Sequence, residues 1–367
     1  MDIAIRTVSE PADQEAVARL RYQVFVRDMD RRPTGTDDEL EQVRDPDDEI
    51  STVLGAFDGN DLVACLRLTP VQRVPTESLW RRTFLFSEFP DAESEQFILS
   101  YMIIRSDRRD SPVLARLLEH AYSFLREAGG ELLFLLSPPN LVTLYEVLGA
   151  RRYTAEGVDI GGLRWPMVMI AGDLPHFEAV KSPLLDALRR YPTDISLGDW
   201  FEQKFPEFSR PSSQRAQSPE DFMRSLSHRI NDASIPLLDD LDGSETTRLL
   251  ASGDQIMLAS GKPVLRKGET GTKMYLILEG AVEVSVTTPR GRRVLTTMGA
   301  GQLFGEGAFL LGTTRSADVT TLSDSLLLAL DTSDFDTLST LEPAIAVKLL
   351  RNLCRMLCVR LYAGSAA

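Results

Sequence analysis

The chain has 367 residues, of which 43% are hydrophobic and 26% charged, and its formal net charge is −14. This length is sufficient for two domains that each bury a core. The negative charge, most of which falls in residues 1–232, argues against general binding to the phosphate backbone of nucleic acids. Three histidines that are far apart in the sequence and three cysteines without metal-ligand spacing give no indication of a metal site.

The start of the chain shows no signal peptide, because Met1-Asp2-Ile3 leads directly into a strand pattern. No apolar run approaches the ~20 residues that a helix needs to cross a bilayer. We therefore expect a soluble, cytoplasmic protein without a membrane span.

The first part of the chain alternates strand patterns with helical spacing of apolar residues. The longest strand pattern carries almost no charge before its end, which favours the centre of a sheet. The helix after it is expected to have Ser111 as N-cap, Pro112 at its first position and Gly129-Gly130 after its end. In chain order we predict a strand (2–8), a helix (11–28), a hairpin of two strands (51–57 and 62–68), the central strand (96–105), a helix (112–128), a strand (131–136), a short helix ending at Gly149 and a last strand (163–170). This order predicts an α+β domain with a mixed sheet flanked by helices.

The order of elements and two segments resemble the GNAT acyltransferase family. One segment is the helix pattern around Tyr145, which an asparagine precedes and Gly149 ends; the other is the loop after the central strand. In that family, N–H groups at a helix start hold the pyrophosphate of acyl-coenzyme A. Where the family usually has glycines, this loop has Asp110, Pro112 and Leu114. The resemblance implies that the donor, an acyl-coenzyme A or an acyl carrier protein, contacts Arg108, Arg109, Ser111 and Asn140.

Tyr145 is the residue for which this resemblance implies a catalytic role. An amine attacks the thioester, and N–H groups at a bulge of the central strand would stabilise the resulting oxyanion. Tyr145 would then protonate the departing thiolate. The alternative is a packed helix residue with its hydroxyl at the surface. The expected acceptor amine belongs to an amino acid or to a protein lysine.

A second resemblance covers most of residues 15–150. Segments 21–25 and 65–70, with an acidic loop between them, look like the acyl-homoserine-lactone and long-chain N-acyl amino acid synthases. This chain has Ile98-Leu99-Ser100-Tyr101 where the lactone synthases carry Glu-x-Ser-Arg. Only the N-acyltransferase class is therefore carried over.

The acidic loop, residues 28–49, has two interpretations. It is either a solvated face or a surface that attracts a cationic amine substrate. Arg21 and Arg67 likewise either contact a substrate carboxylate or carrier phosphate, or pair with this loop.

Residues 174–236 differ in composition from what precedes them. Aromatic residues between Trp200 and Phe208 predict a short amphipathic piece that packs on a neighbour, and residues 209–219 are a linker by composition. We predict a GNAT-like domain over 1–173, a helical connector over 174–236 and a second domain over 237–367.

The second domain is predicted to be a β-roll or jelly roll with closing helices. A helical region at 237–252 comes first, and a helix over 343–361 closes the roll; a lid or a homodimer contact is compatible with that helix. Cys354 and Cys358 on it are expected to be small buried side chains rather than a disulfide. Between the helices, short strands alternate with glycine turns at 255–259, 264–265, 274–278, 281–287, 293–298, 317–322 and 325–330.

The segment 304–319 places an acid beside glycines and then brings Arg315 into an otherwise apolar strand sequence. A buried charge is costly unless it is paired. Arg315 therefore needs an anionic partner, which is either Glu306 or a ligand phosphate.

This segment, with the residues from Val264 to Gly280, resembles the cyclic-nucleotide-binding domain family. The resemblance implies that Glu306 accepts the ribose 2′-hydroxyl and that Arg315 pairs with the cyclic phosphate. Ser316 favours cAMP, with cGMP as the alternative. The nucleotide site implied in this way consists of Gly305, Glu306, Gly307, Ala308, Arg315 and Ser316.

The two resemblances together predict an N-acyltransferase regulated by a cyclic nucleotide. The alternative is a cyclic-nucleotide sensor with a non-catalytic GNAT-like binding domain. In either case a ligand biases the protein only by its difference in affinity for two conformations.

Overall fold

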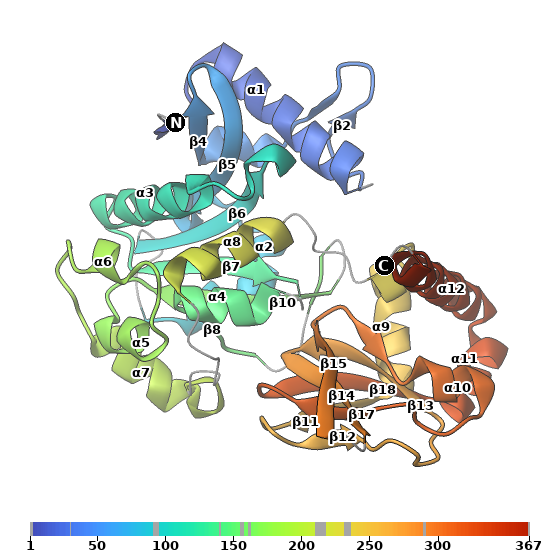
Figure 1. The fold of residues 1–367 in the computed structure, drawn as a ribbon. Helices are drawn as coiled ribbons and strands as arrows, with labels where there is room; N and C mark the ends of the chain where they lie inside the picture. The colour runs from blue at the N-terminus through green and yellow to red at the C-terminus, as the bar shows by residue number, and fades with distance from the viewer. Residues whose placement is uncertain are drawn as a thin grey trace.

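The structure, a computed structural model, describes residues 3–29, 31–90, 95–138, 141–154, 158–160, 163–209, 218–230, 236–288 and 291–365. Figure 1 shows an N-terminal part built on one large sheet and a C-terminal part built on smaller sheets. This agrees with the predicted α+β class, a mixed sheet with flanking helices followed by a β-roll.

The large sheet has the strand order β1-β4-β5-β6-β7-β10-β8, and β9 pairs with β10. The neighbours are antiparallel except β6 and β7, which run parallel, so the sheet is mixed as predicted. The predicted central strand is β6, in the middle of this order. The strands are β1 (Ile3–Thr7), β4 (Thr52–Asp58), β5 (Asp61–Pro70), β6 (Gln96–Ile104), β7 (Leu132–Ser137), β8 (Ala150–Arg152), β9 (Val158–Asp159) and β10 (Leu163–Ile170).

The hairpin and the end of helix α3 (Val113–Glu127) follow the turn signals in the sequence, whereas the start of α3 does not. β4 and β5 form the predicted hairpin, in which Gly59 has a φ of 63° that glycine adopts without strain. Helix α3 ends as predicted, just before Gly129 with its φ of 77°. Its start is different, because Pro112 is the N-cap and the Ser111 hydroxyl donates to the Arg108 carbonyl at 2.5 Å. The prediction of Ser111 as N-cap is therefore wrong: its hydroxyl bonds within the preceding turn.

Helices cover both faces of the large sheet. Alternate side chains of β7 show the two faces, because Leu133 and Leu135 join one apolar cluster and Phe134 joins another. Phe201, from the aromatic segment predicted to pack on a neighbour, lies in the second cluster. The first cluster takes side chains from α3, α4 (Val142–Leu148), α5 (Leu174–Ala179), α6 (Leu185–Leu188) and α8 (Pro219–Arg229). The other face is covered by α1 (Pro11–Tyr22), α2 (Leu79–Phe84) and α7 (Ser196–Lys204).

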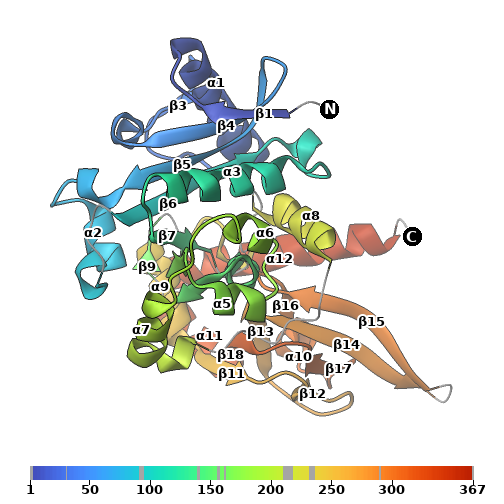
Figure 2. The same ribbon diagram turned by 90° about the vertical axis from the view of Figure 1, so that its left-hand side faces the viewer.

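The C-terminal part contains two four-stranded sheets, of order β11-β18-β13-β16 and β12-β17-β14-β15. Apolar side chains from both sheets, such as Ile277 and Val282, share one cluster, as expected for a β-roll. In Figure 2 the strands of these two C-terminal sheets lie below the large N-terminal sheet. The elements are α9 (Gly243–Ser252), β11 (Asp254–Leu258), β12 (Pro263–Leu265), β13 (Lys273–Glu279), β14 (Ala281–Thr288), β15 (Gly291–Gly299), β16 (Leu303–Phe304), α10 (Glu306–Leu311), β17 (Asp318–Thr321), β18 (Ser325–Asp331), α11 (Thr332–Leu341) and α12 (Pro343–Ser365).

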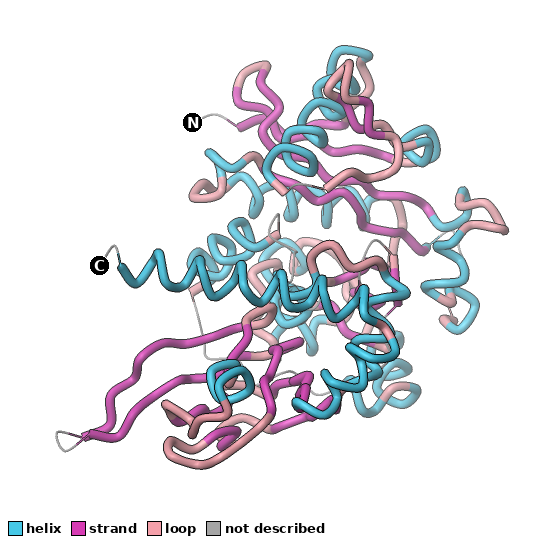
Figure 3. Tube along the Cα trace, turned by 90° about the vertical axis from the view of Figure 1, so that its right-hand side faces the viewer, coloured by secondary structure: helices cyan, strands magenta, loops and turns pink. Residues whose placement is uncertain are grey.

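Helix α12 is the long helix that ends at the C-terminus in Figure 3. Ile345, Leu349 and Leu353 are buried against the roll, as predicted for a closing helix. Cys354 and Cys358 are exposed and free, so the expectation of buried cysteines is wrong. The buried stripe is rotated away from them around the helix. None of the helices in the described ranges is both long and apolar enough to span a membrane.

Candidate functional site

The predicted nucleotide segment turns from a short strand into a short helix. β16 leads to Gly305, whose φ of 78° lies in the left-handed region, and α10 begins at Glu306. The Arg315 side chain is buried, and its Nη1 donates to the Gly305 carbonyl oxygen at 2.9 Å. The arginine thus joins the two ends of the segment.

Arg315 lies before strand β17, in agreement with the strand predicted at 317–322, and the backbone around it is not an extended strand segment. The strand begins only at Asp318. The Arg315 N–H donates to the Glu269 carbonyl at 2.8 Å, and its carbonyl accepts from the Gly268 N–H at 2.8 Å. These bonds fix the backbone, so that the side chain reaches the start of α10.

Two glycines leave room for the Arg315 guanidinium. A Cβ atom on Gly305 would lie 2.8 Å from Nη1, and one on Gly271 would lie 2.6 Å from Nη2. Both distances are shorter than non-bonded carbon and nitrogen atoms tolerate. Gly271 was not predicted as a site residue. It lies two residues before strand β13, and its closeness to Arg315 becomes evident only in the fold.

The arrangement suits a singly charged phosphate diester. The first N–H groups of a helix have no partner inside it, so those of Gly307 and Ala308 are available beside the guanidinium. The Glu306 side chain is half-buried, and its carboxylate can accept a hydrogen bond from a hydroxyl. Ser316 is exposed directly after Arg315. The predicted residues therefore lie in two short stretches, 305–308 and 315–316, which the bond from Arg315 to the Gly305 carbonyl joins. Their roles in nucleotide binding remain predictions.

In the large sheet, β6 and β7 part beside Tyr101. Their pairing ends at Leu99 and Leu135, while β6 continues to Ile104. Two residues of β6, one of them Tyr101 with a φ of 49°, stand opposite Leu66 of β5. This is a β-bulge in the central strand. The predicted bulge in the central strand is therefore present, where the pairing of β6 with β7 ends, and the role of its N–H groups toward an oxyanion stays a prediction.

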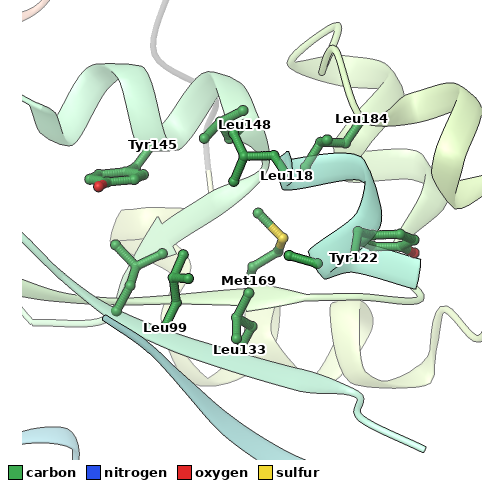
Figure 4. A pocket seen from close by; sticks show the side chains of 10 residues that line it. Leu99, Leu118, Tyr122, Leu133, Tyr145, Leu148, Met169 and Leu184 are labelled. Atoms are coloured by element: carbon green, nitrogen blue, oxygen red, sulfur yellow. The ribbon is translucent and has the colours of Figure 1, made fainter. Parts of the chain in front are cut away.

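Tyr145 lies on α4 and is 7% exposed. Its ring lines a cavity of about 20 Å³ whose other walls are apolar, such as Leu99 and Met169. In Figure 4 the hydroxyl points away from these side chains. Burial raises the pKa of the phenol, so Tyr145 keeps its proton near neutral pH. A protonated phenol is the form that a general acid requires.

The predicted donor residues lie around the start of α3, and only some of them are available. Arg108 pairs with Asp58 at 2.9 Å and with Asp107 at 3.6 Å. The Ser111 hydroxyl is engaged with a carbonyl, as described above. The buried Nε of Arg109 has no hydrogen-bond partner among the described residues. Asn140 lies outside the described residues, so its predicted contact is not placed.

Arg21 and Arg67 are both fully buried, and both pair with the acidic loop. Arg21 donates to both Asp48 oxygens, at 2.6 and 2.9 Å. Arg67 lies 3.2 Å from Asp45 and 3.2 Å from Asp48. Of the two interpretations offered above, pairing with the loop is therefore the one observed, and the loop is partly an internal ion-pair partner rather than a fully solvated face.

Tyr101 joins this arginine–aspartate cluster to the bulge. Its hydroxyl donates to Asp45 at 2.8 Å, and its ring lies under the Arg21 and Arg67 guanidinium groups, at 4.1 and 4.7 Å. Burial opposes ionisation of Asp45, but Arg67 and the Tyr101 hydroxyl outweigh it and lower the pKa of that carboxyl. Beneath the cluster, burial raises the pKa of the Cys65 thiol to about 11. The Tyr101 side chain thus ties the bulge to the buried charges of Asp45, Arg21 and Arg67.

His176, at the start of α5, gives a pH-dependent prediction. Burial, and then the charge of Arg151, lower its pKa to about 3. In the unfolded chain histidine binds a proton below pH ~6.5, so folding should lose stability as the pH falls from there, by about 2 kcal/mol at pH 5. Between pH 7.5 and pH 5, the free energy of unfolding of a His176→Gln variant should therefore fall by about 2 kcal/mol less than that of the parent protein. Urea unfolding at the two pH values is the measurement. Equal losses in both proteins would contradict this assignment.

Comparison with known proteins supports two kinds of domain. Residues 20–119 match the model of an acetyltransferase (GNAT) domain. Residues 255–340 match the model of a cyclic nucleotide-binding domain, which includes the segment around Arg315.

Individual relatives cover only part of the chain. A putative potassium channel protein of Rhodopseudomonas palustris is 36% identical over 118 residues, 32% of this chain and 28% of the channel. The cyclic AMP receptor protein of Thermus thermophilus is 33% identical over 123 residues, 33% of this chain and 57% of the receptor. The solved catabolite activator protein of Thermus thermophilus has 31% identity and a TM-score of 0.33, over 36% of this chain and 60% of that protein. The chain thus carries a GNAT acetyltransferase domain in its N-terminal part and a cyclic nucleotide-binding domain in its C-terminal part.

Proposed function

We propose that the chain is an N-acyltransferase whose activity a cyclic nucleotide regulates, with domains over 1–173 and 237–367 and a connector over 174–236. The observation that carries this proposal is the match of two separate family models to one chain. The buried Arg315 beside Gly305 supports the nucleotide site. Ser316, directly after Arg315, favours cAMP over cGMP as the ligand.

The proposed reaction moves an acyl group from a thioester to an amine. The amine nitrogen attacks the thioester carbonyl, a C–N bond forms, and the N–H groups at the Tyr101 bulge stabilise the oxyanion. Collapse then breaks the C–S bond, and Tyr145 donates its proton to the sulfur. The proton of the amine passes to water, and water returns a proton to the Tyr145 phenolate. An acyl-coenzyme A or an acyl carrier protein supplies the thioester, and the resemblance to N-acyl amino acid synthases favours an amino acid as acceptor.

A second candidate function is a cyclic-nucleotide sensor whose GNAT-like domain binds without catalysis. The observation that favours it is at the start of α3, where Arg108 and the Ser111 hydroxyl are engaged within the protein. Turnover is therefore the property that separates the two functions.

The test is acyl transfer by the full chain, followed by mass spectrometry with amino acids and a lysine peptide, with and without cAMP. Acetyl-coenzyme A, a long-chain acyl-coenzyme A and an acyl carrier protein serve as donors. Tyr145→Phe should lower kcat by at least about 100-fold with little change in the donor KM, since it removes only the acid.

Tyr122→Phe is the matched control. Tyr122 lines the same cavity, but its hydroxyl donates to the Ala171 carbonyl at 2.6 Å. Its loss should leave kcat within about threefold. Equal turnover by Tyr145→Phe and the parent protein would rule out the proposed acid, and no turnover with any donor would favour the sensor alone.

A further inference from the structure

Helix α8, the last helix before the nucleotide-binding domain, packs on the face of the sheet that carries the proposed transfer site. It contacts α3 directly and lies between α3 and α4 in Figure 1. Arg224 on α8 lies 3.9 Å from Asp110, in the loop before α3. The connector thus reaches the loop where the donor pyrophosphate is expected.

The apolar side of α8 is part of the N-terminal core. Phe222 and Leu226 are 3% and 0% exposed and share one cluster with Leu114 of α3 and with Val142 and Tyr145 of α4. These two helices flank the opening where β6 and β7 part. Docked α8 therefore packs on the same apolar face as Tyr145, the residue that a thioester has to reach.

A donor thioester and docked α8 compete for the same space. The thioester carbonyl has to lie beside the bulge at Tyr101, with its sulfur close to the Tyr145 hydroxyl. A donor that extends from the start of α3 toward α4 would meet Phe222 and Leu226, which belong to the same apolar cluster as both helices. On this route, the donor and docked α8 exclude each other.

The segment after α8 is held by the closing helix α12. The buried Asn352 side chain donates to the Leu237 carbonyl at 3.2 Å and also to the carbonyl of Asp239. Lys348 pairs with Glu245 at 2.5 Å. Through these contacts, a movement of α12 is passed to the residues that follow α8.

The nucleotide site is connected to α12 by packing. Phe309 of α10 lies edge-on to Phe335 of α11, with ring centroids 6.1 Å apart, and shares a cluster with Leu349 of α12. A ligand that contacts Glu306 and Arg315 therefore acts on the element that holds the α8 connection.

We propose that α8 is an autoinhibitory helix that covers the donor entrance and that cyclic-nucleotide binding releases it through α12. This deepens the proposed function and rests on it for the identity of the donor. Ser227 is 1% exposed, and its hydroxyl has no hydrogen-bond partner among the described residues. An unpartnered buried hydroxyl weakens the docking of α8, which suits a helix that has to detach.

The first experiment measures release directly, by hydrogen exchange of the α8 amides in the full chain. Saturating cAMP should speed their exchange about 5- to 150-fold, the usual range of coupling between sites. At a cAMP concentration about tenfold above the dissociation constant of the parent protein, an Arg315→Ala variant should stay mostly unliganded and show much less change. Bound cAMP without faster exchange in the parent protein would overturn the coupling.

The second experiment detaches α8 from the N-terminal core by mutation, in the absence of nucleotide. Leu226→Asp places a charge at the most buried position of α8, so acetyl-coenzyme A should bind at least about tenfold more tightly by titration calorimetry. Glu220→Gln, on the exposed side of α8, should bind like the parent protein. Ser227→Ala should slow α8 exchange, because it removes the unpartnered hydroxyl.

The outcomes separate this proposal from the proposed function. Equal acetyl-coenzyme A affinity in Leu226→Asp and the parent protein, with measurable binding in both, would overturn autoinhibition. If Leu226→Asp shows fast α8 exchange and still binds no acetyl-coenzyme A, the use of a coenzyme A donor is rejected. In that case, release of α8 by cAMP is judged on the exchange data alone.

Discussion

Arg315→Ala is expected to weaken cAMP binding by about 30- to 150-fold, measured by titration calorimetry. Hydrogen bonds to a charged group contribute about 2–3 kcal/mol when they are lost from a buried site. The variant also loses the bond from Nη1 to the Gly305 carbonyl, which joins the two ends of the segment. Arg315→Lys should recover only part of the affinity, because an ammonium group cannot bridge the carbonyl and a phosphate in one plane.

The control for this prediction is Arg293→Ala. Arg293 is an exposed arginine on β15 of the same domain, so its loss tests for a general effect of charge. We expect its affinity for cAMP to stay within about twofold of the parent value. Similar losses in the two variants would contradict a specific role for Arg315.

Arg67→Ala is expected to destabilise the N-terminal part by about 3–5 kcal/mol. The side chain is 1% exposed, and its removal leaves the carboxylates of Asp45 and Asp48 without their shared cation. Urea unfolding followed by tryptophan fluorescence is the measurement. Trp80 is a nearby reporter, since its indole N–H donates to Asp47 at 3.1 Å.

Arg19→Ala is the matched control for the buried cluster. Arg19 forms an ion pair with Glu15 on the surface of the same helix that carries Arg21, and its side chain is 65% exposed. Its removal should change the free energy of unfolding by at most about 0.5 kcal/mol. If Arg67→Ala were as harmless as Arg19→Ala, the cluster would not be a major source of stability.

The elements of the fold were largely predictable because their signals are local. A strand with few charges, such as β6, has few positions available to it except the centre of a sheet. Gly59 marks a hairpin because the tight turn requires a positive φ, which glycine adopts without strain. The start of α3 was predicted wrongly because the Ser111 hydroxyl has two local partners. It can cap the helix or donate to the Arg108 carbonyl, and the sequence does not rank these two bonds.

The partners of buried charges were not predictable, because they depend on contacts between distant segments. The sequence left Arg21 and Arg67 with either a ligand or the acidic loop, and only the fold shows the bonds to Asp48. Likewise, the sequence did not indicate that backbone bonds to Gly268 and Glu269 hold Arg315 in place before strand β17.

The position of α8 was the largest gap in the sequence interpretation. Its residues follow a polar stretch and were assigned to a connector. Phe222 and Leu226 are at helical spacing, but the surface that they cover is formed by α3 and α4, far away in the sequence. Similarly, the outward rotation of Cys354 and Cys358 follows from which side of α12 meets the roll.

The three cysteines differ in a way that makes the natural chain easy to label. Thiol reagents react with the thiolate, and burial keeps the Cys65 thiol protonated near neutral pH, with its pKa at about 11. Cys354 and Cys358 are exposed on α12. A maleimide dye should therefore attach to the closing helix and spare the N-terminal part. Such a dye would report optically on the helix that links the nucleotide site to α8, without any cysteine having to be added or removed.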